Sequence, residues 1–294
     1  MKSFIMALLM SVMMVPVAVS QDDNKEYKVG DYYYRLFIGN EWYCPSDCNS
    51  VQLTRSELVE EYPVGDVVVP DCVSIEGVEC QVVSVVMTAF NWMSEGQVLK
   101  LPSTIRHIER NFEEDEKVFG EDTRRVSVVY PEQIESVGSY GLAFANLDES
   151  VSFPSIKTVR YAAFYESGVS NLSFGPNLTM VGTGALSDDG ITTLNFEPNA
   201  SGSISFASFS VGSDMMEELK LPERKVMNLS EQICRRSTSL KRVVFPDVST
   251  INYISLVNSI VGITQFPYGY IFAENPNLSE IVCLGCVPPE FNIP

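Results

Sequence analysis

The sequence is poor in the residues that enzymatic catalysis most often needs. It has one histidine, His107, in 294 residues, so a Ser-His-Asp or Cys-His enzyme would have to use that side chain. It has no Gly-x-Ser-x-Gly turn, which presents the nucleophilic serine in many hydrolases. The carboxylate run Glu113–Glu116 is typical of a solvated loop rather than a catalytic pair. The sequence therefore predicts no catalytic residue and no enzyme activity.

Basic residues are also scarce. Lysine and arginine total 20 against 38 acidic residues, which gives a formal net charge of -18, and no run of basic residues is longer than two. Such a surface repels phosphate backbones, so nucleic acid is excluded as an expected partner. An acidic surplus of this kind is typical of a soluble surface rather than of a cation site.

Long apolar runs are missing after the first twenty residues. Residues 1–20 contain Lys2, an apolar run from Phe4 to Val15, and Ala18-Val19-Ser20, a pattern typical of a secretory signal with a small-residue cleavage site. No later stretch approaches the ~20 apolar residues of a spanning helix. No cysteine stands at the cleavage point, so no lipid anchor is expected. The sequence predicts a secreted, cell-surface or periplasmic protein without a transmembrane segment after signal cleavage.

What the sequence does contain is a repeated strand pattern. Apolar residues alternate and are followed by proline in Val151–Pro154, Leu172–Pro176 and Leu194–Pro198. Alternation predicts a strand with one buried face, and proline ends it because it cannot donate to a ladder. The pattern also occurs at Leu99–Pro102, Val128–Pro131, Leu219–Pro222 and Val243–Pro246. The spacing predicts a leucine-rich-repeat solenoid, mainly β, with one short parallel strand per ~22–25-residue coil and irregular or short helical turns between strands.

A second feature recurs between the strands and makes the pattern more specific. A small residue precedes a large apolar one at Ala143-Phe144, Ala163-Phe164 and Ala185-Leu186, and these pairs are expected to fill the core between coils. Strand, proline, an Ile or Val pair and Gly-x-x-Ala-Phe together resemble the BspA-like leucine-rich repeat of secreted and surface proteins, known best from Bacteroides-type bacteria. The pattern departs from this family near Asn111, Phe209 and Cys234. The resemblance implies an exported recognition protein.

The chain is expected to divide into four parts. Residues 1–20 are the signal peptide, 21–66 an N-terminal β cap, 67–270 the solenoid and 271–294 a C-terminal capping repeat. The caps are expected because a solenoid must hide its terminal cores from water. In the N-terminal cap, Tyr32–Phe37 and Val51–Leu53 are predicted strands.

Seven cysteines in an exported chain favour disulfides. Cys72 and Cys80 are equidistant from Glu76 in a predicted hairpin, so they are expected to face each other and form a bridge. Two further pairs could each close a small loop: Cys44 with Cys48, and Cys283 with Cys286.

Metal and redox sites are the alternatives for the short cysteine pairs. A zinc site is disfavoured because the two pairs lie at opposite ends of the chain. Redox catalysis at Cys283 and Cys286 lacks a thioredoxin-like context. No metal and no cofactor are therefore expected, and Cys234 is expected to be buried in a coil.

The middle residue of each repeated strand points away from the core, and these residues form a candidate binding column. The column is short and its residues vary in type, with no aromatic ladder and no stripe of like charge. We expect a non-catalytic recognition or adhesion protein that binds a protein or glycoprotein ligand through this sheet face. The alternative is a structural or accessory cell-envelope protein that acts by self-association or complex assembly. The column comprises Lys100, Val129, Ser152, Ser173, Asn195, Lys220 and Val244.

Overall fold

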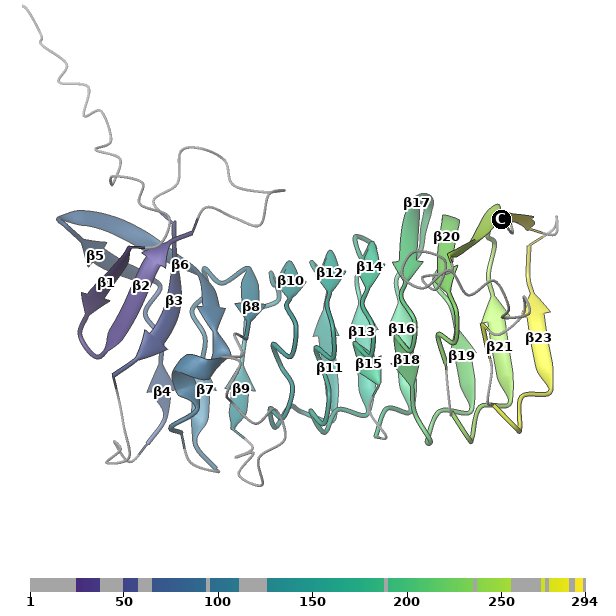
Figure 1. The fold of residues 1–294 in the computed structure, drawn as a ribbon, viewed down its shortest axis with the longest axis horizontal. Coiled ribbons are helices and arrows are strands. Elements are labelled where there is room, and N and C mark those ends of the chain that lie inside the picture. The colour runs from purple at the N-terminus through teal and green to yellow at the C-terminus, as the bar shows by residue number, and fades with distance from the viewer. Residues whose placement is uncertain are drawn as a thin grey trace, which may run out of the picture.

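The chain folds into an elongated stack of coils (Figure 1). The structure, a computed structural model, describes residues 25–37, 50–57, 65–93, 96–110, 126–187, 190–234, 237–254, 271–272, 275–285 and 289–292. The expected signal peptide, the carboxylate run at 113–116, and Cys44, Cys48 and Cys286 lie outside these residues.

One long sheet runs the length of the stack, and we call it the main sheet. From β3 onward its neighbouring strands are parallel, whereas β1, β2 and β3 pair antiparallel. Its path is β1 (Glu26–Val29), β2 (Tyr32–Leu36), β3 (Ser50–Ser56), β6 (Val78–Val86), β8 (His107–Glu109), β10 (Ser136–Val137), β12 (Thr158–Val159), β14 (Met180–Val181), β17 (Asn199–Phe206), β20 (Arg224–Ser230), β22 (Thr250–Ile254) and β24 (Glu290–Asn292).

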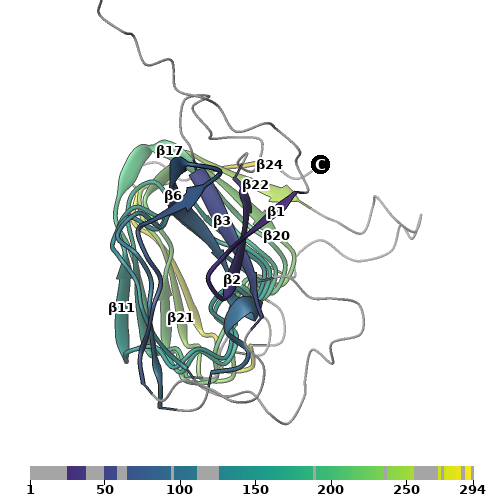
Figure 2. The same cartoon turned by 90° about the vertical axis from the view of Figure 1, so that its left-hand side faces the viewer.

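The opposite side of each coil carries a strand of one of three short parallel sheets, which we call face sheets 1, 2 and 3 (Figure 2). Face sheet 1 is β4 (Val67–Val68), β7 (Val98–Lys100) and β9 (Ser127–Val129). Face sheet 2 is β11 (Ser150–Phe153), β13 (Asn171–Phe174) and β16 (Thr193–Phe196). Face sheet 3 is β19 (Glu218–Lys220), β21 (Arg242–Phe245) and β23 (Glu280–Cys283).

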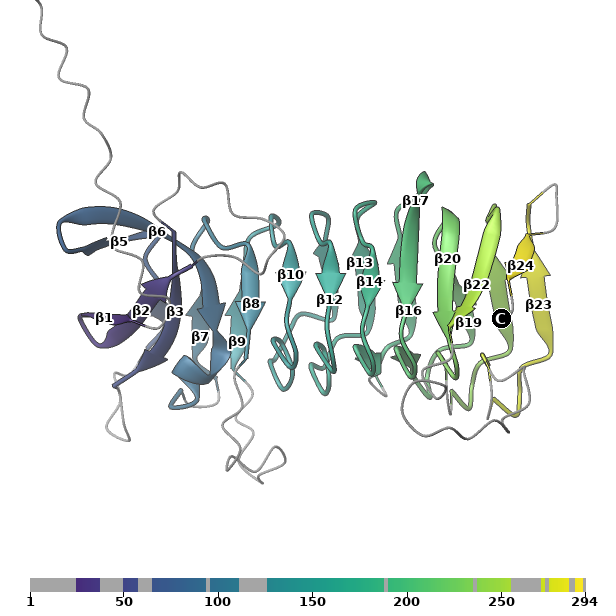
Figure 3. The same ribbon diagram turned by 45° about the horizontal axis from the view of Figure 1, so that its top comes forward.

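The solenoid is confirmed, but most coils carry two principal strands instead of the expected one. The second strand belongs to the main sheet and in the central coils is only two residues long, as in β10, β12 and β14 (Figure 3). Two residues are too few to show an alternation, so the sequence did not reveal them. In the turns that the structure describes, β15 (Leu186–Ser187) forms a short ladder with β18 (Val211–Gly212), and residues Met87–Phe90 form a 3₁₀ turn, η1.

The small-plus-large pairs fill the core, as expected. Ala163 and Phe164 are both fully buried, and the Phe164 ring meets Phe153 edge-on at a centroid distance of 5.3 Å. Phe153 also stacks with Phe174 of the next coil at 6.3 Å. Such aromatic contacts stabilise beyond the area they bury, by about 1 kcal/mol each. The coil that lacks an Ala-Phe pair packs Cys234 instead, 1% exposed, which confirms the expected burial of Cys234.

The N-terminal segment is a three-stranded antiparallel ribbon whose last strand, β3, joins β6 of the main sheet in parallel. β2 and β3 were expected from the sequence, whereas β1 was not. Tyr34 and Leu53 point into the core at 1% and 0% exposure, and the Tyr32 ring lies 6.0 Å from that of Phe90. The ribbon therefore closes the apolar interior of the first coil.

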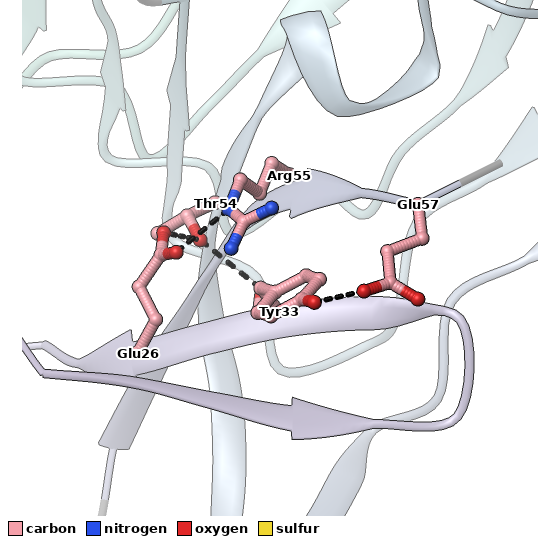
Figure 4. A network of polar contacts seen from close by, with 5 residues as sticks. All are labelled: Glu26, Tyr33, Thr54, Arg55 and Glu57. Atoms are coloured by element: carbon pink, nitrogen blue, oxygen red, sulfur yellow. Dashed lines mark hydrogen bonds and ion pairs between the residues drawn. The ribbon is translucent and has the colours of Figure 1, made fainter. Parts of the chain in front are cut away.

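The outer face of this ribbon carries a polar network (Figure 4). The Arg55 guanidinium lies 3.5 Å from the centre of the Tyr33 ring, and its Nε donates to Glu26 Oε2 at 2.7 Å. Thr54 Oγ1 donates to Glu26 Oε1 at 2.6 Å, and the Tyr33 hydroxyl donates to Glu57. These contacts join all three strands, and their exposure limits the pair energies to roughly 0.5–1 kcal/mol.

At the C-terminal end, the final strand of face sheet 3 covers the previous coil but is itself uncovered. Val243 is fully buried and lies opposite Ile281 in the ladder, whereas Ile281 is 54% exposed. Leu284 is 58% exposed. Within the residues described, no element packs over the inward side of β23.

Candidate functional site

The candidate column lies on the face sheets but is not continuous. Lys100 faces Val129 within face sheet 1. Ser152, Ser173 and Asn195 lie side by side within face sheet 2, where the Asn195 amide donates to Ser173 Oγ at 3.4 Å. The structure therefore brings the central three residues together, whereas in the described part of the chain no ladder joins face sheet 2 to face sheets 1 and 3.

One member of the column does not point into solvent. Val244 is only 3% exposed, in contrast to 54% for Val129. Val244 occupies a central strand and has ladder neighbours on both sides, Lys220 and Val282. Position in the sheet does not account for this difference, because Lys100 also has ladder neighbours on both sides, Val68 and Val129, and is exposed. The exposed column therefore ends at Lys220, and the inclusion of Val244 was wrong.

The coil between face sheets 2 and 3 is longer than the coil before it. Leu172 and Leu194 are ladder partners 22 residues apart, whereas the next inward leucine, Leu219, follows Leu194 by 25 residues. The longer coil contains β17, an eight-residue strand with a register shift between Asn199 and Ser203. β16 and β19 follow one another along the stack, but no ladder joins them in the described residues.

A cleft of about 810 Å³ lies at this break. Its walls are β16 and β19, with contributions from the turns that follow β21 and β23. The apolar lining is Leu194, Phe196, Met215, Leu221 and Leu284, and the charged lining is Glu217, Glu218, Lys220, Glu223 and Asp247. Asn195 and Lys220 of the candidate column both line it, so the cleft interrupts the predicted binding face.

The apolar part of the cleft is accessible. Phe196 continues the ring row of Phe153 and Phe174, and it stacks on Phe174 at 5.5 Å. Phe153 and Phe174 are fully buried, whereas Phe196 is half-buried and also meets Phe206 edge-on at 6.1 Å. Met215 beside it is 58% exposed. Accessible apolar side chains in a concave site are typical of ligand binding.

A buried arginine supports the wide coil behind the cleft. Arg224 is fully buried, and its Nη1 donates to the carbonyl oxygens of Glu197 and Glu223 at 3.0 and 2.8 Å. Its Nη2 and the Asn199 amide both donate to the carbonyl oxygen of Pro176, at 3.2 and 3.0 Å. Burial lowers the pKa of Arg224. The sequence analysis missed this residue, because nothing in a repeat pattern marks an inward arginine.

The cysteine hairpin differs from the expectation. β5 (Cys72–Ile75) and β6 pair around a two-residue turn, Glu76-Gly77, so Cys72 lies opposite Gln81 and Cys80 opposite Val73. The two cysteines are therefore offset by one residue and point to opposite faces. Both thiols are free, and the expectation that they face each other was wrong. Cys283 is also free and is exposed.

His107 is held in a structural environment. Its Nδ1 lies 2.8 Å from Ser136 Oγ, and its ring stacks on Phe37 at 5.0 Å. Burial lowers its pKa to about 4. Among the described residues, no group of three or more His, Cys, Asp or Glu side chains could hold a metal ion. Nor does any helix in these residues have the length and apolarity to cross a membrane.

Comparison with known families decides the classification. The family model described as "BspA type Leucine rich repeat region" matches this chain in six copies, over residues 83–211 and 135–261. These ranges together span more than half of the chain. The chain belongs to the BspA-type leucine-rich repeat family. The matched range contains the central column and all of the cleft lining except Leu284.

One solved structure supports the fold. A leucine-rich cell surface protein from Faecalibacterium prausnitzii has a TM-score of 0.54 at 12% identity, over 89% of this chain and 77% of that one. A leucine-rich repeat protein from Bacteroides ovatus also matches at 12% identity, over 87% and 99% of the two chains, with a TM-score of 0.28. The first likeness supports the solenoid fold. The comparison with curated proteins found no match.

Proposed function

We propose that this protein is a non-catalytic surface protein that binds a macromolecular ligand through face sheets 1–3. The observation that carries the proposal is the aligned column of face sheet 2, in which Ser152 and Asn195 are exposed and Ser173 is partly exposed, bordered by an accessible cleft. Membership of a repeat family whose solenoids present extended binding surfaces supports it. The structural likeness to a cell surface protein is consistent with display outside the cell.

Retention on coated surfaces tests this proposal. Beads that carry the chain from residue 21 are passed over mucin, extracellular matrix and cell-envelope fractions. A triple variant, Ser152→Arg with Ser173→Arg and Asn195→Arg, places three bulky cations on the column and is expected to reduce retention about tenfold. The control, Thr179→Arg with Met180→Arg, changes exposed positions at and before β14 of the main sheet and should leave retention unchanged. Equal retention by both variants, or retention on no surface, would refute the proposal.

A second candidate, self-association, is favoured by the uncovered strand β23. Its exposed Ile281 and unpaired edge are features that can pair with another chain. Sedimentation velocity over a range of concentrations should then show a dimer that Ile281→Glu abolishes. A monomer at all concentrations would exclude this role.

A further inference from the structure

We draw no further inference here: the strongest candidate, a surface patch on the turns after β10 and β12 in which Tyr161 is 48% exposed and its ring meets that of Tyr140 edge-on at 5.1 Å, carries nothing because no residue that the structure describes shows what covers it.

Discussion

The two ends of the solenoid are built differently, although both must border water. At the N-terminal end, an antiparallel ribbon inserts Tyr34 and Leu53 into the core at 1% and 0% exposure. At the C-terminal end, β23 adds one more parallel strand and leaves Ile281 54% exposed. The N-terminal end is closed by antiparallel strands, whereas the C-terminal end finishes with one more parallel strand of the repeat. A further repeated strand covers the coil before it but leaves its own inward side chains uncovered.

The largest expected effect comes from removing the repeated end. Deletion from Asn275 onward removes β23 and β24 and exposes Val243 and Phe245, which are 0% and 5% exposed in the whole chain. Loss of their burial alone should reduce the free energy of unfolding by about 3–6 kcal/mol. Chemical denaturation and light scattering should show a lower midpoint and aggregation. Removal of residues 293–294 alone serves as the control. An unchanged midpoint in the long deletion would show that burial of Val243 and Phe245 by β23 does not contribute to stability.

Truncation of one large side chain at each end should show that the two ends contribute differently to stability. Tyr34→Ala leaves a cavity in a closed core and should destabilise the protein by about 3–5 kcal/mol. Ile281→Ala removes an exposed side chain and should change stability by less than about 1 kcal/mol. Urea denaturation of both variants measures the difference. Equal losses would mean that β23 is covered as completely as the ribbon.

The N-terminal side should also respond to pH through His107. Burial holds its pKa at about 4, below its ordinary value of 6.5, with Arg106 and Lys157 opposing protonation and Glu135 favouring it. Between these two pH values the unfolded chain binds a proton that the folded protein does not, so stability falls as the pH is lowered.

From pH 7.5 to pH 5 the loss attributable to this group should be about 2 kcal/mol. The loss is measured as the difference between the wild-type protein and His107→Gln in urea denaturation at each pH. Parallel stability curves for the two proteins would show that His107 is solvated.

The smallest effect concerns thiol reactivity and should leave stability unchanged. Cys283, on the uncovered strand, is exposed, whereas Cys80 is buried and burial raises the pKa of its thiol. Alkylation of the native protein should therefore label Cys283 and spare Cys80 and Cys234. After denaturation without reductant, Cys72 and Cys80 should both be labelled. A peptide linked through Cys72 and Cys80 would contradict the hairpin register.

The sequence by itself determined the repeat architecture. Alternation followed by proline located most of the face-sheet strands, because burial of one strand face places apolar residues at every second position. The Ala-Phe pairs located part of the core. The aromatic run at Tyr32–Leu36 likewise located β2 in the N-terminal ribbon.

Only the tertiary structure decided how these strands are joined. The turn at Glu76-Gly77 has two residues, and this length places Cys72 and Cys80 on opposite faces of the hairpin. β16 and β19 follow one another along the stack without forming a ladder, which the spacing of the repeats did not reveal. The burial of Val244 and Arg224 also depends on neighbours from other coils. A local pattern specifies which residues face inward, but register and coil length act between segments far apart in the chain. The candidate binding face was therefore foreseeable in outline, and its interruption by a cleft was not.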